Sequence, residues 1–524
     1  MGSTKFIDMN ISVISLLLTI AVICGCGGSG KQSSDEKTSK DKYEENWESL
    51  AKHNESPEWF RDAKLGIYFH WGVYSVPAFG NEWYPRWMHF EWHDVYKHHV
   101  ENYGHPSTFG YHDFVPMFKA ENFDANEWAD LFVKAGARFA GPVAEHHDGF
   151  SMWDSEKTPW NAMDKGPKKD ITGELKEAFD QRGLKLITTF HHAKHLQRYN
   201  DRVQEELNSD KPRGRQFRNS HYPPFEGMPP ASDDPELKYL YGNLPEDKWL
   251  EEVWFGKLKE VADTYHPDIM WFDSWLDEIP ENYRQKYCAY YLNQAEKWGK
   301  EVVIIRKQND LPLDVSVDDL EKSRKNRLEE KTWMTDETIS KGSWCYTRDL
   351  QIKPAKDVLH VLIDIVSKNG VLLLNISPKA NGTIPRNQKD VLLTMGNWLD
   401  QYGEAIYETR PWYTYGEGPT KEPEGHFKNR KEFLKIKYSA RDVRYTTKDD
   451  VIYATLLGWP GNNKTIQLNA FSKEAWKGAQ EIDHVALLGS DEKIDYALSD
   501  EGLQLTTPND PVDEMAVVFK IALK

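Results

Sequence analysis

The sequence predicts an α/β protein in which a (β/α)8-like barrel of the TIM type is followed by a C-terminal antiparallel β-sandwich. Its 524 residues are enough for a barrel of about 250 residues or more and a smaller second domain. From about residue 60 to 405, short β-rich runs alternate with helical patterns, which is typical of repeated βα units. After about residue 415, strand patterns follow one another with no helix between them, as in a sandwich.

The expected barrel strands are apolar runs that end in polar or aromatic residues. They cover residues 65–71, 138–146, 185–192, 268–275, 301–307 and 370–377. A helix is expected at 124–136, because Asp124 and Glu127 form a capping pair and Gly136 supplies a C-terminal stop. Further helices are expected at 252–265 and 355–368. We place the barrel at residues 46–412 and the sandwich at 413–524.

In such a barrel, the active site lies at the carboxyl ends of the strands. The polar residues at these ends should therefore converge on one opening; they are His70, His146, His147, His191, Asp273 and Arg306. Residues 199–245, rich in proline and charge, are too long for an ordinary connection and should rim that opening.

The N-terminus has the features of an export signal. Residues 11–25 are apolar but shorter than the roughly 20 residues that span a bilayer, so residues 1–25 are interpreted as a signal peptide. The end of this run resembles the lipobox of bacterial lipoproteins, which makes Cys26 the expected lipidation site. Residues 26–45 are small, polar and charged, as in a flexible tether. The chain is thus expected to be a periplasmic or cell-surface lipoprotein, attached to the membrane only through Cys26.

Composition excludes one large class of partner. The chain carries 83 acidic and 66 basic residues, a net charge of −17, which argues against nucleic acid because nothing would offset the phosphate charge. Apart from Cys24 and Cys26 of the lipobox, the chain has only Cys288 and Cys345, too few for a disulfide framework. Both stand in aromatic stretches and are expected to be core thiols.

A cluster of histidines invites a metal interpretation. Its members are His146, His147, Asp148, His191, His192 and His195. Adjacent histidines on a strand point to opposite faces, so His146 and His147 cannot share an ion without a bulge. His191 and His195 have the spacing of two ligands on a helix, but they follow a strand and have no third ligand at a motif-like distance. Histidines satisfied within the core are the second alternative.

Asp273 is the best candidate for a catalytic carboxylate. It ends an apolar strand between Trp271 and Trp275, where an unpaired carboxylate is costly unless it has a function or a cationic partner such as Arg306. Glycoside hydrolysis needs two carboxylates, an acid and a nucleophile or base. Alternatively, Asp273 caps the next helix.

Four motifs, in this order, resemble the α-L-fucosidases of glycoside hydrolase family 29. They are "AKLGIYFHWGVYSVPAFGNEWYPRWM", "EHHDGFSMWDSEKTPWNAMDKGPKKDITGEL", "PDIMWFD" and "SKNGVLLLNISPKANGTIP". The resemblance runs from about residue 45 to 415. It implies a retaining exo-glycosidase with a catalytic barrel, a C-terminal sandwich, no metal and no cofactor, acting on a fucosylated oligosaccharide or glycoconjugate.

The resemblance also implies site residues. The fucose-binding positions match His70, Glu82, Trp83, His146, His147, Trp271, Arg306 and Trp344. Neutral imidazoles and a carboxylate suit sugar hydroxyls, and aromatic faces suit the C5 methyl group of fucose. Asp273 matches the family nucleophile. Phe190 stands where some relatives carry tyrosine.

The acid/base residue of the family lies on a variable loop, and Glu321 of "VDDLEKSR" is our choice for it. Glu329 and Glu330 are its rivals, and a solvated charged loop is the alternative for all three. The chain is therefore expected to be an α-L-fucosidase. A surface fucose-binding protein without catalysis and a metal-dependent hydrolase are the other hypotheses.

Overall fold

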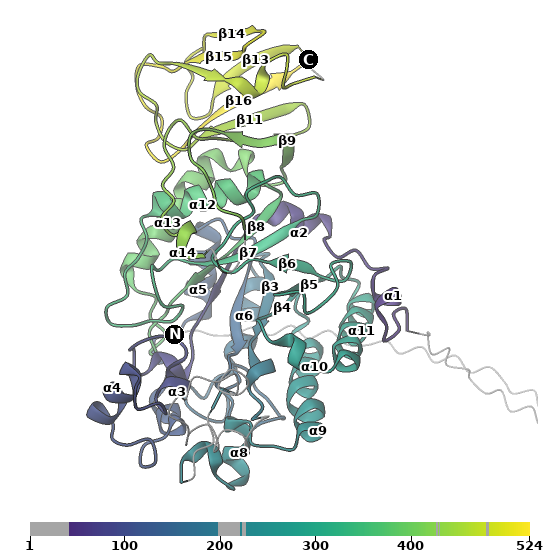
Figure 1. The fold of residues 1–524 in the computed structure, drawn as a ribbon, viewed down its shortest axis with the longest axis vertical. Helices are drawn as coiled ribbons and strands as arrows, with labels where there is room; N and C mark the ends of the chain where they lie inside the picture. Colours follow the sequence, from purple (N-terminus) through teal and green to yellow (C-terminus); the bar gives the residue numbers. More distant parts are fainter. Residues whose placement is uncertain (1–40, 198–220, 223–226, 426–427, 429, 478–480) are drawn as a thin grey trace, which may run out of the picture. The chain divides into compact units, whose positions relative to one another are not determined.

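Eight parallel strands close into a barrel in sequence order, with β1 paired to both β2 and β8. Figure 1 labels strands β3 to β8 of this barrel. The strands are β1 (Leu65–Phe69), β2 (Phe139–Glu145), β3 (Lys185–Phe190), β4 (Ile269–Phe272), β5 (Val303–Arg306), β6 (Val317–Asp319), β7 (Trp333–Thr338) and β8 (Gly370–Ile376). The structure, a computed structural model, describes residues 41–197, 221–222, 227–425, 428, 430–477 and 481–524. Residues 42–524 form one compact unit.

In the described residues, helices surround the barrel, and several of them lie in the connections between its strands. Those of at least seven residues are α4 (Asp94–Asn102), α5 (Ala125–Lys134), α6 (Ile171–Asp180), α8 (Pro235–Tyr241), α10 (Gly256–Tyr265), α11 (Glu281–Trp298), α12 (Ala355–Ser367) and α13 (Arg386–Tyr402). The shorter ones are α1 (Trp47–Leu50), α2 (Glu58–Ala63), α3 (Tyr84–Trp87), α9 (Glu246–Lys248) and α14 (Arg430–Phe433). A π-helical turn, Trp249–Phe255, leads into α10.

The helix expected at 124–136 is α5. Asp124 caps it by accepting hydrogen bonds from the backbone N–H groups of Asn126 and Glu127. The carboxylate of Glu127 pairs with Lys389 of α13, so this residue joins two helices. Of the expected capping pair, Asp124 therefore caps the helix, whereas Glu127 contacts α13.

The sequence revealed six of the eight strands, all within a few residues of their observed bounds. It missed β6 and β7, because β6 is three residues long with two aspartates and β7 is Trp-Met-Thr-Asp-Glu-Thr. Neither has the continuous apolar run of a strand that is buried on both faces. Glu321, expected on a variable loop, therefore lies just beyond the carboxyl end of β6.

Alternate residues of each strand fill the barrel interior. Tyr68, Ile269, Trp271, Val303 and Ile305 belong to one buried cluster inside the barrel. Their neighbours Ile67, Phe69, Met270 and Ile304 pack in the larger core with the helices. Side chains alternate along a strand, so the residues that follow β1, β4 and β5 continue the same alternation between the barrel interior and the outer core.

The C-terminal part contains two antiparallel sheets. One has the order β13-β16-β11-β10-β9 and the other β12-β15-β14. The strands are β9 (Arg410–Glu417), β10 (Val443–Lys448), β11 (Val451–Leu456), β12 (Thr465–Leu468), β13 (Ile482–Leu487), β14 (Tyr496–Ser499), β15 (Gly502–Thr506) and β16 (Val517–Leu523). Residues of both sheets share one buried cluster, as expected of a sandwich.

The sandwich packs on the barrel through α12, which contacts β8 on one side and β9 and β10 on the other (Figure 1). Buried charges join the two parts: Asp364 of α12 accepts from Arg444 of β10 at 2.6 Å and lies 3.2 Å from Arg324 Nε. Lys368 Nζ lies 2.8 Å from the same carboxylate.

Cys288 and Cys345 are buried free thiols, as expected, and burial raises the pKa of Cys288 to about 12. Cys26, the signal peptide and nearly all of the tether lie outside the described residues. Within the described ranges, no helix combines the length and apolar character that a membrane span requires.

Candidate active site

The histidine after β1 points into the mouth of the barrel. His70 follows the interior residue Tyr68 by two positions and is buried. Its backbone N–H and its ring Nδ1 both lie within hydrogen-bonding distance of Asn375 Oδ1, at 2.9 and 2.8 Å. Since the amide oxygen only accepts, Nδ1 carries the proton and Nε2 keeps a free lone pair. Burial, together with the neighbouring His191, lowers the pKa of His70 well below its ordinary value.

An irregularity in β2 re-aims the two adjacent histidines. The pairing of β2 with β3 shifts between Val143 and Glu145. Glu145 thereby pairs with Lys257 of α10 at 2.7 Å in a fully buried ion pair. The chain then delivers His146 and His147 to the mouth. Both histidines follow the end of β2, so the irregularity precedes the pair and does not lie between its members.

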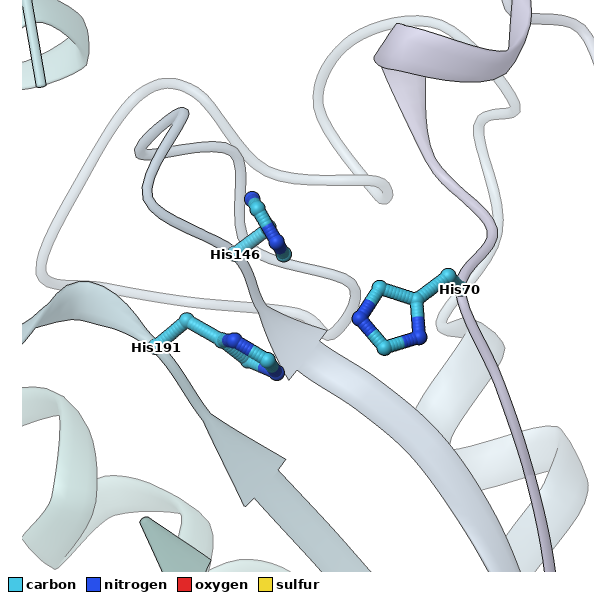
Figure 2. A group of neighbouring side chains, drawn as sticks. All are labelled: His70, His146 and His191. Carbon is cyan, nitrogen blue, oxygen red and sulfur yellow. The ribbon is translucent and has the colours of Figure 1, made fainter. Parts of the chain in front are cut away.

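His146 and His147 share the mouth with His191. The His146 ring centroid lies 4.5 Å from that of His191, and the His147 centroid lies 5.5 Å from it. Figure 2 shows the rings of His70, His146 and His191 facing a common space, although they come from three strand ends. Burial, together with the neighbouring histidines, lowers the pKa of His146 well below its ordinary value. Burial lowers the pKa of His147 to about 4, although Asp273 opposes this shift.

Asp273 lies beside this histidine group. It follows the interior residue Trp271 by two positions, and its Oδ2 lies 3.3 Å from His147 Nε2 and 3.2 Å from His191 Nδ1. Its Oδ1 accepts a hydrogen bond from Lys307 at 3.2 Å. Burial alone would raise the pKa of Asp273, but Lys307 and the two histidines hold it well below its ordinary value. Asp273 is thus a carboxylate, and its backbone N–H bonds Phe190 rather than starting a helix.

The cation beside Asp273 is Lys307, and the expectation that Arg306 would serve there was wrong. Arg306 follows Ile305 and so shares the outward direction of Ile304, whereas Lys307 shares the inward direction of Ile305. The guanidinium of Arg306 bonds Asp318, Asn309 and the carbonyl of Leu311. Arg306 therefore shapes the loop after β5 and does not reach the pocket through these contacts.

Lys307 also faces three other carboxyl groups. Its Nζ lies 3.4 Å from Glu321 Oε2, 3.1 Å from Asp336 Oδ2 and 3.9 Å from Asp319 Oδ2. Burial and the nearby Asp336 raise the pKa of Asp319 well above its ordinary value. Despite burial, the surrounding carboxylates raise the pKa of Lys307, so it is a permanent cation.

Three further residues of the expected pocket, Glu82, Trp83 and Trp344, lie against one another or against the histidines of the mouth. Glu82 Oε2 accepts from the backbone N–H of Trp344 at 3.2 Å, and burial raises its pKa. The Trp344 ring stacks on His70 with centroids 5.2 Å apart. Trp83 lies 4.9 Å from His147, centroid to centroid.

Trp271 and Phe190 have different places. Trp271 is fully buried in the barrel floor, where its Nε1 donates to Asp319 Oδ2 at 3.0 Å and its ring lies 5.1 Å from His191. Phe190 packs against Trp153 and His192. His191, one residue later, is the side chain that enters the pocket from β3.

Glu321 stands at the same end of the barrel as Asp273. Burial raises its pKa, Lys307 opposes this, and the carboxylates of Asp336 and Asp273 raise it further. Its rivals lie elsewhere: the backbone carbonyls of Glu329 and Glu330 accept from Asn369, the residue just before β8. Both therefore lie at the amino end of the strands, away from Asp273.

Among the residues that the structure describes, two groups of side chains could hold a metal ion: His70, His146 and His191, or His147, His191 and Asp273, each with ligand atoms within 4.8 Å of one another. Spacing along the chain could not reveal them, because each group draws on different strands. A tetrahedral zinc site has Zn–N distances of about 2.0–2.1 Å, so its nitrogens lie roughly 3.4 Å apart. In the second group, Asp273 Oδ2 already lies near this spacing, at 3.3 Å from His147 Nε2 and 3.2 Å from His191 Nδ1. His195, in contrast, is committed to Leu240 and Trp249 through its two ring nitrogens.

Sequence reasoning did not assign several residues of the mouth. Asn375 was visible as a polar residue in an apolar strand, but its role needs the pairing of β8 with β1. His221 belongs to the long connection expected at the rim. Its ring lies 5.5 Å from His147 and 5.4 Å from Trp83, and neither ring nitrogen has a hydrogen-bond partner among the described residues.

The arrangement suits sugar chemistry. One carboxyl group is held ionised and another has a raised pKa, and both face one ammonium at the mouth of the barrel. Imidazole nitrogens without a hydrogen-bond partner among the described residues, such as His146 Nδ1 and His191 Nε2, can donate to or accept from hydroxyl groups. Such a pair of carboxyls is what glycoside hydrolysis requires.

Two family models match nearly the whole chain, and both describe proteins with this chemistry. The family model Alpha-L-fucosidase matches residues 31–404, and Alpha-L-fucosidase C-terminal domain matches residues 437–524. The chain is 30% identical to tissue alpha-L-fucosidase of Rattus norvegicus over 501 residues, with 92% of each chain covered. It is 30% identical to plasma alpha-L-fucosidase of Homo sapiens over 504 residues, again with 92% coverage of both.

Solved structures agree. A crystal structure of Thermotoga maritima alpha-fucosidase in complex with fucose superposes with a TM-score of 0.68 at 27% identity, covering 92% of this chain and 100% of that one. The same enzyme in complex with a mechanism-based inhibitor gives a TM-score of 0.69 at 27% identity, with the same coverage.

Proposed function

The chain belongs to the α-L-fucosidase family and is a glycoside hydrolase, and we propose that it releases terminal α-L-fucose from glycans by double displacement, with retention of the anomeric configuration. The observation that carries this proposal is the pair of carboxyl groups beside Lys307. The pKa of Asp273 is held low and that of Glu321 is raised, which suits a nucleophile and a general acid respectively.

In the first step, Asp273 attacks the anomeric carbon from the face opposite the leaving group. The bond to the glycosidic oxygen breaks as Glu321 gives its proton to that oxygen. The product is a covalent fucosyl-enzyme with inverted configuration. In the second step, the Glu321 carboxylate takes a proton from water, which attacks the same carbon and frees Asp273. Two inversions give net retention.

The remaining pocket residues are proposed to hold the sugar. His70, His146, His191 and His221 offer ring nitrogens to hydroxyl groups, and the buried Glu82 offers a carboxyl group. Trp83 and Trp344 supply flat apolar faces for the C5 methyl group. Trp271 supports the floor beneath them through Asp319.

Hydrolysis of an aryl α-L-fucoside, followed by proton NMR, tests the proposal. We expect turnover with α-fucose as the first anomer to appear. First-formed β-fucose would disprove retention. A folded protein that binds fucose without turnover would instead support the non-catalytic alternative.

The two possible metal-binding groups make a metal-dependent hydrolase the second candidate function. It predicts loss of turnover in EDTA and recovery on adding Zn²⁺. The mechanism above predicts equal rates with and without the chelator, because Asp273 and Glu321 supply the nucleophile and the proton.

The N-terminal sequence supports a separate proposal about location. Removal of residues 1–25 and lipidation of Cys26 would anchor an exported enzyme at a bacterial membrane. The tether would then present the barrel to fucosylated glycans outside the cytoplasm.

A further inference from the structure

A connection of the C-terminal domain reaches the mouth of the barrel. It joins β9 to β10 and carries α14, which begins at Arg430. The Arg430 guanidinium lies 3.0 Å from Glu321 Oε1, although the two residues are 109 positions apart. The Arg430 side chain is 38% exposed and that of Glu321 13%, so the pair lies at the edge of the site.

The same connection packs against the loop that carries Glu321. Gly425 runs so close to this loop that a Cβ atom there would lie 2.3 Å from the carbonyl oxygen of Arg324. The Arg324 guanidinium lies 4.9 Å from the centre of the Phe433 ring and donates to Tyr438 Oη at 3.4 Å. Arg430 is thus held by a packed segment.

Glu321 is held from two sides. Lys307 approaches Oε2 from the barrel floor and Arg430 approaches Oε1 from the C-terminal domain. The other charges that act on Glu321 are Asp336, Asp273 and Lys322. Lys307 is shared with three other carboxyl groups, and Arg430 adds a second cation on the other oxygen of Glu321.

We propose that Arg430 is a positioning residue of the active site, which fixes the carboxyl group of Glu321 and sets the pH range over which it serves as general acid. This inference rests on the proposed function, in which Glu321 is the acid. A cation 3.0 Å from Oε1 favours the carboxylate form, so Arg430 limits how far burial raises the acid's pKa. The C-terminal domain thereby takes part in catalysis.

The test is the pH profile of kcat/KM for Arg430→Gln, measured on a substrate with a poor leaving group, such as an alkyl α-L-fucoside. The alkaline limb reports deprotonation of the acid in the free enzyme. Removing the cation should move that limb upward by about one pH unit. Arg430→Lys, which keeps the charge, should give a smaller shift.

Leaving-group dependence separates this role from a structural one. An activated aryl fucoside needs little protonation in the first step, so the alkaline limb of its kcat/KM should stay in place in Arg430→Gln. A general loss of fold would lower kcat/KM for both substrates alike. Arg327→Gln is the matched control, because Arg327 is 77% exposed and pairs with Glu329 at the other end of the barrel.

An unchanged alkaline limb in both Arg430 variants, with the alkyl fucoside still cleaved, would overturn the inference and leave the proposed function standing. Failure of the proposed function has a different signature: no fucoside is cleaved by the wild type. If Arg430→Gln does not fold, Arg430→Lys decides alone. In Arg430→Lys a shorter cation replaces the guanidinium fork. If the alkaline limb of its kcat/KM profile were identical to that of the wild type, this would count against the positioning role.

Discussion

Lys307 donates a hydrogen bond to Asp273 Oδ1 at 3.2 Å and so ties the proposed nucleophile to the barrel floor. The same ammonium lies 3.4 Å from Glu321, the proposed acid. One cation therefore touches both carboxyl groups of the reaction. It also explains how a buried aspartate stays ionised, because burial without a partner would favour the neutral acid.

Replacing the nucleophile should abolish turnover of every substrate. In Asp273→Gly no covalent fucosyl-enzyme can form, so kcat should fall by about 10³-fold or more for aryl fucosides and oligosaccharides alike. Steady-state assays on both substrates measure this. A variant that kept near wild-type activity would remove Asp273 from the mechanism.

Replacing the acid should have an effect that depends on the leaving group. In Glu321→Ala the first step on an activated aryl fucoside should survive, while oligosaccharides, which need the proton, should be cleaved far more slowly. Added azide should restore turnover of the aryl substrate and give α-fucosyl azide, detectable by NMR. Glu330→Ala, at the other end of the barrel, is the control, and rescue of that variant instead would identify it as the acid.

Removing the shared cation should shift the acidic limb of the pH profile. Lys307 helps hold the pKa of Asp273 below its ordinary value, so in Lys307→Met that pKa should rise by about 1–3 units. Because the nucleophile must be ionised, activity should then be lost at a higher pH on the acidic side. Lys307→Arg should restore most of the wild-type profile, and the surface variant Lys331→Met should not differ from wild type. If the acidic limb of the pH profile did not shift in folded Lys307→Met, this result would contradict the role of Lys307.

The buried charges between the barrel and the sandwich should stabilise the fold in a pH-dependent way. Although burial opposes it, Lys368, Arg444 and Arg324 hold the pKa of Asp364 well below its ordinary value. In Asp364→Asn the free energy of unfolding at pH 7 should fall by about 3–5 kcal/mol, as urea denaturation can measure.

The sign of the pH dependence follows from the lowered pKa. The stability that Asp364 contributes is fully present above the unfolded pKa, near pH 4, and is lost as the pH falls through the folded value. The difference between wild type and Asp364→Asn should therefore shrink below about pH 4. Asp390→Asn, whose side chain is 60% exposed, should change stability little. A difference that grew at acid pH would show that Asp364 is not held as a carboxylate.

Lipidation at Cys26 predicts a change of compartment. Cys26→Ser should convert a membrane-associated enzyme into a soluble exported one, which fractionation with an α-fucosidase assay can follow. Cys24→Ser, which leaves the lipidated position intact, should remain with the membrane. Sedimentation of the Cys26 variant with membranes would rule out this anchor.

The order of the elements could be predicted because it depends on local pattern. Apolar runs with polar ends identified six barrel strands, and the change from helical to strand patterns near residue 415 identified the second domain. Asp273 and His70 were expected at the mouth because they follow strand ends, where a barrel gathers its chemistry. Such features can be recognised from a few neighbouring residues of the sequence.

Tertiary structure decided which way side chains face and which distant segments meet. Arg306 and Lys307 are adjacent, and only the direction of β5 in the closed barrel shows that the lysine enters the site. The irregularity in β2 likewise turns Glu145 outward and His146 inward. Arg430 reaches Glu321 from another domain. Spacing along the chain carries no record of such contacts, because barrel closure and domain packing bring together residues that are more than a hundred positions apart.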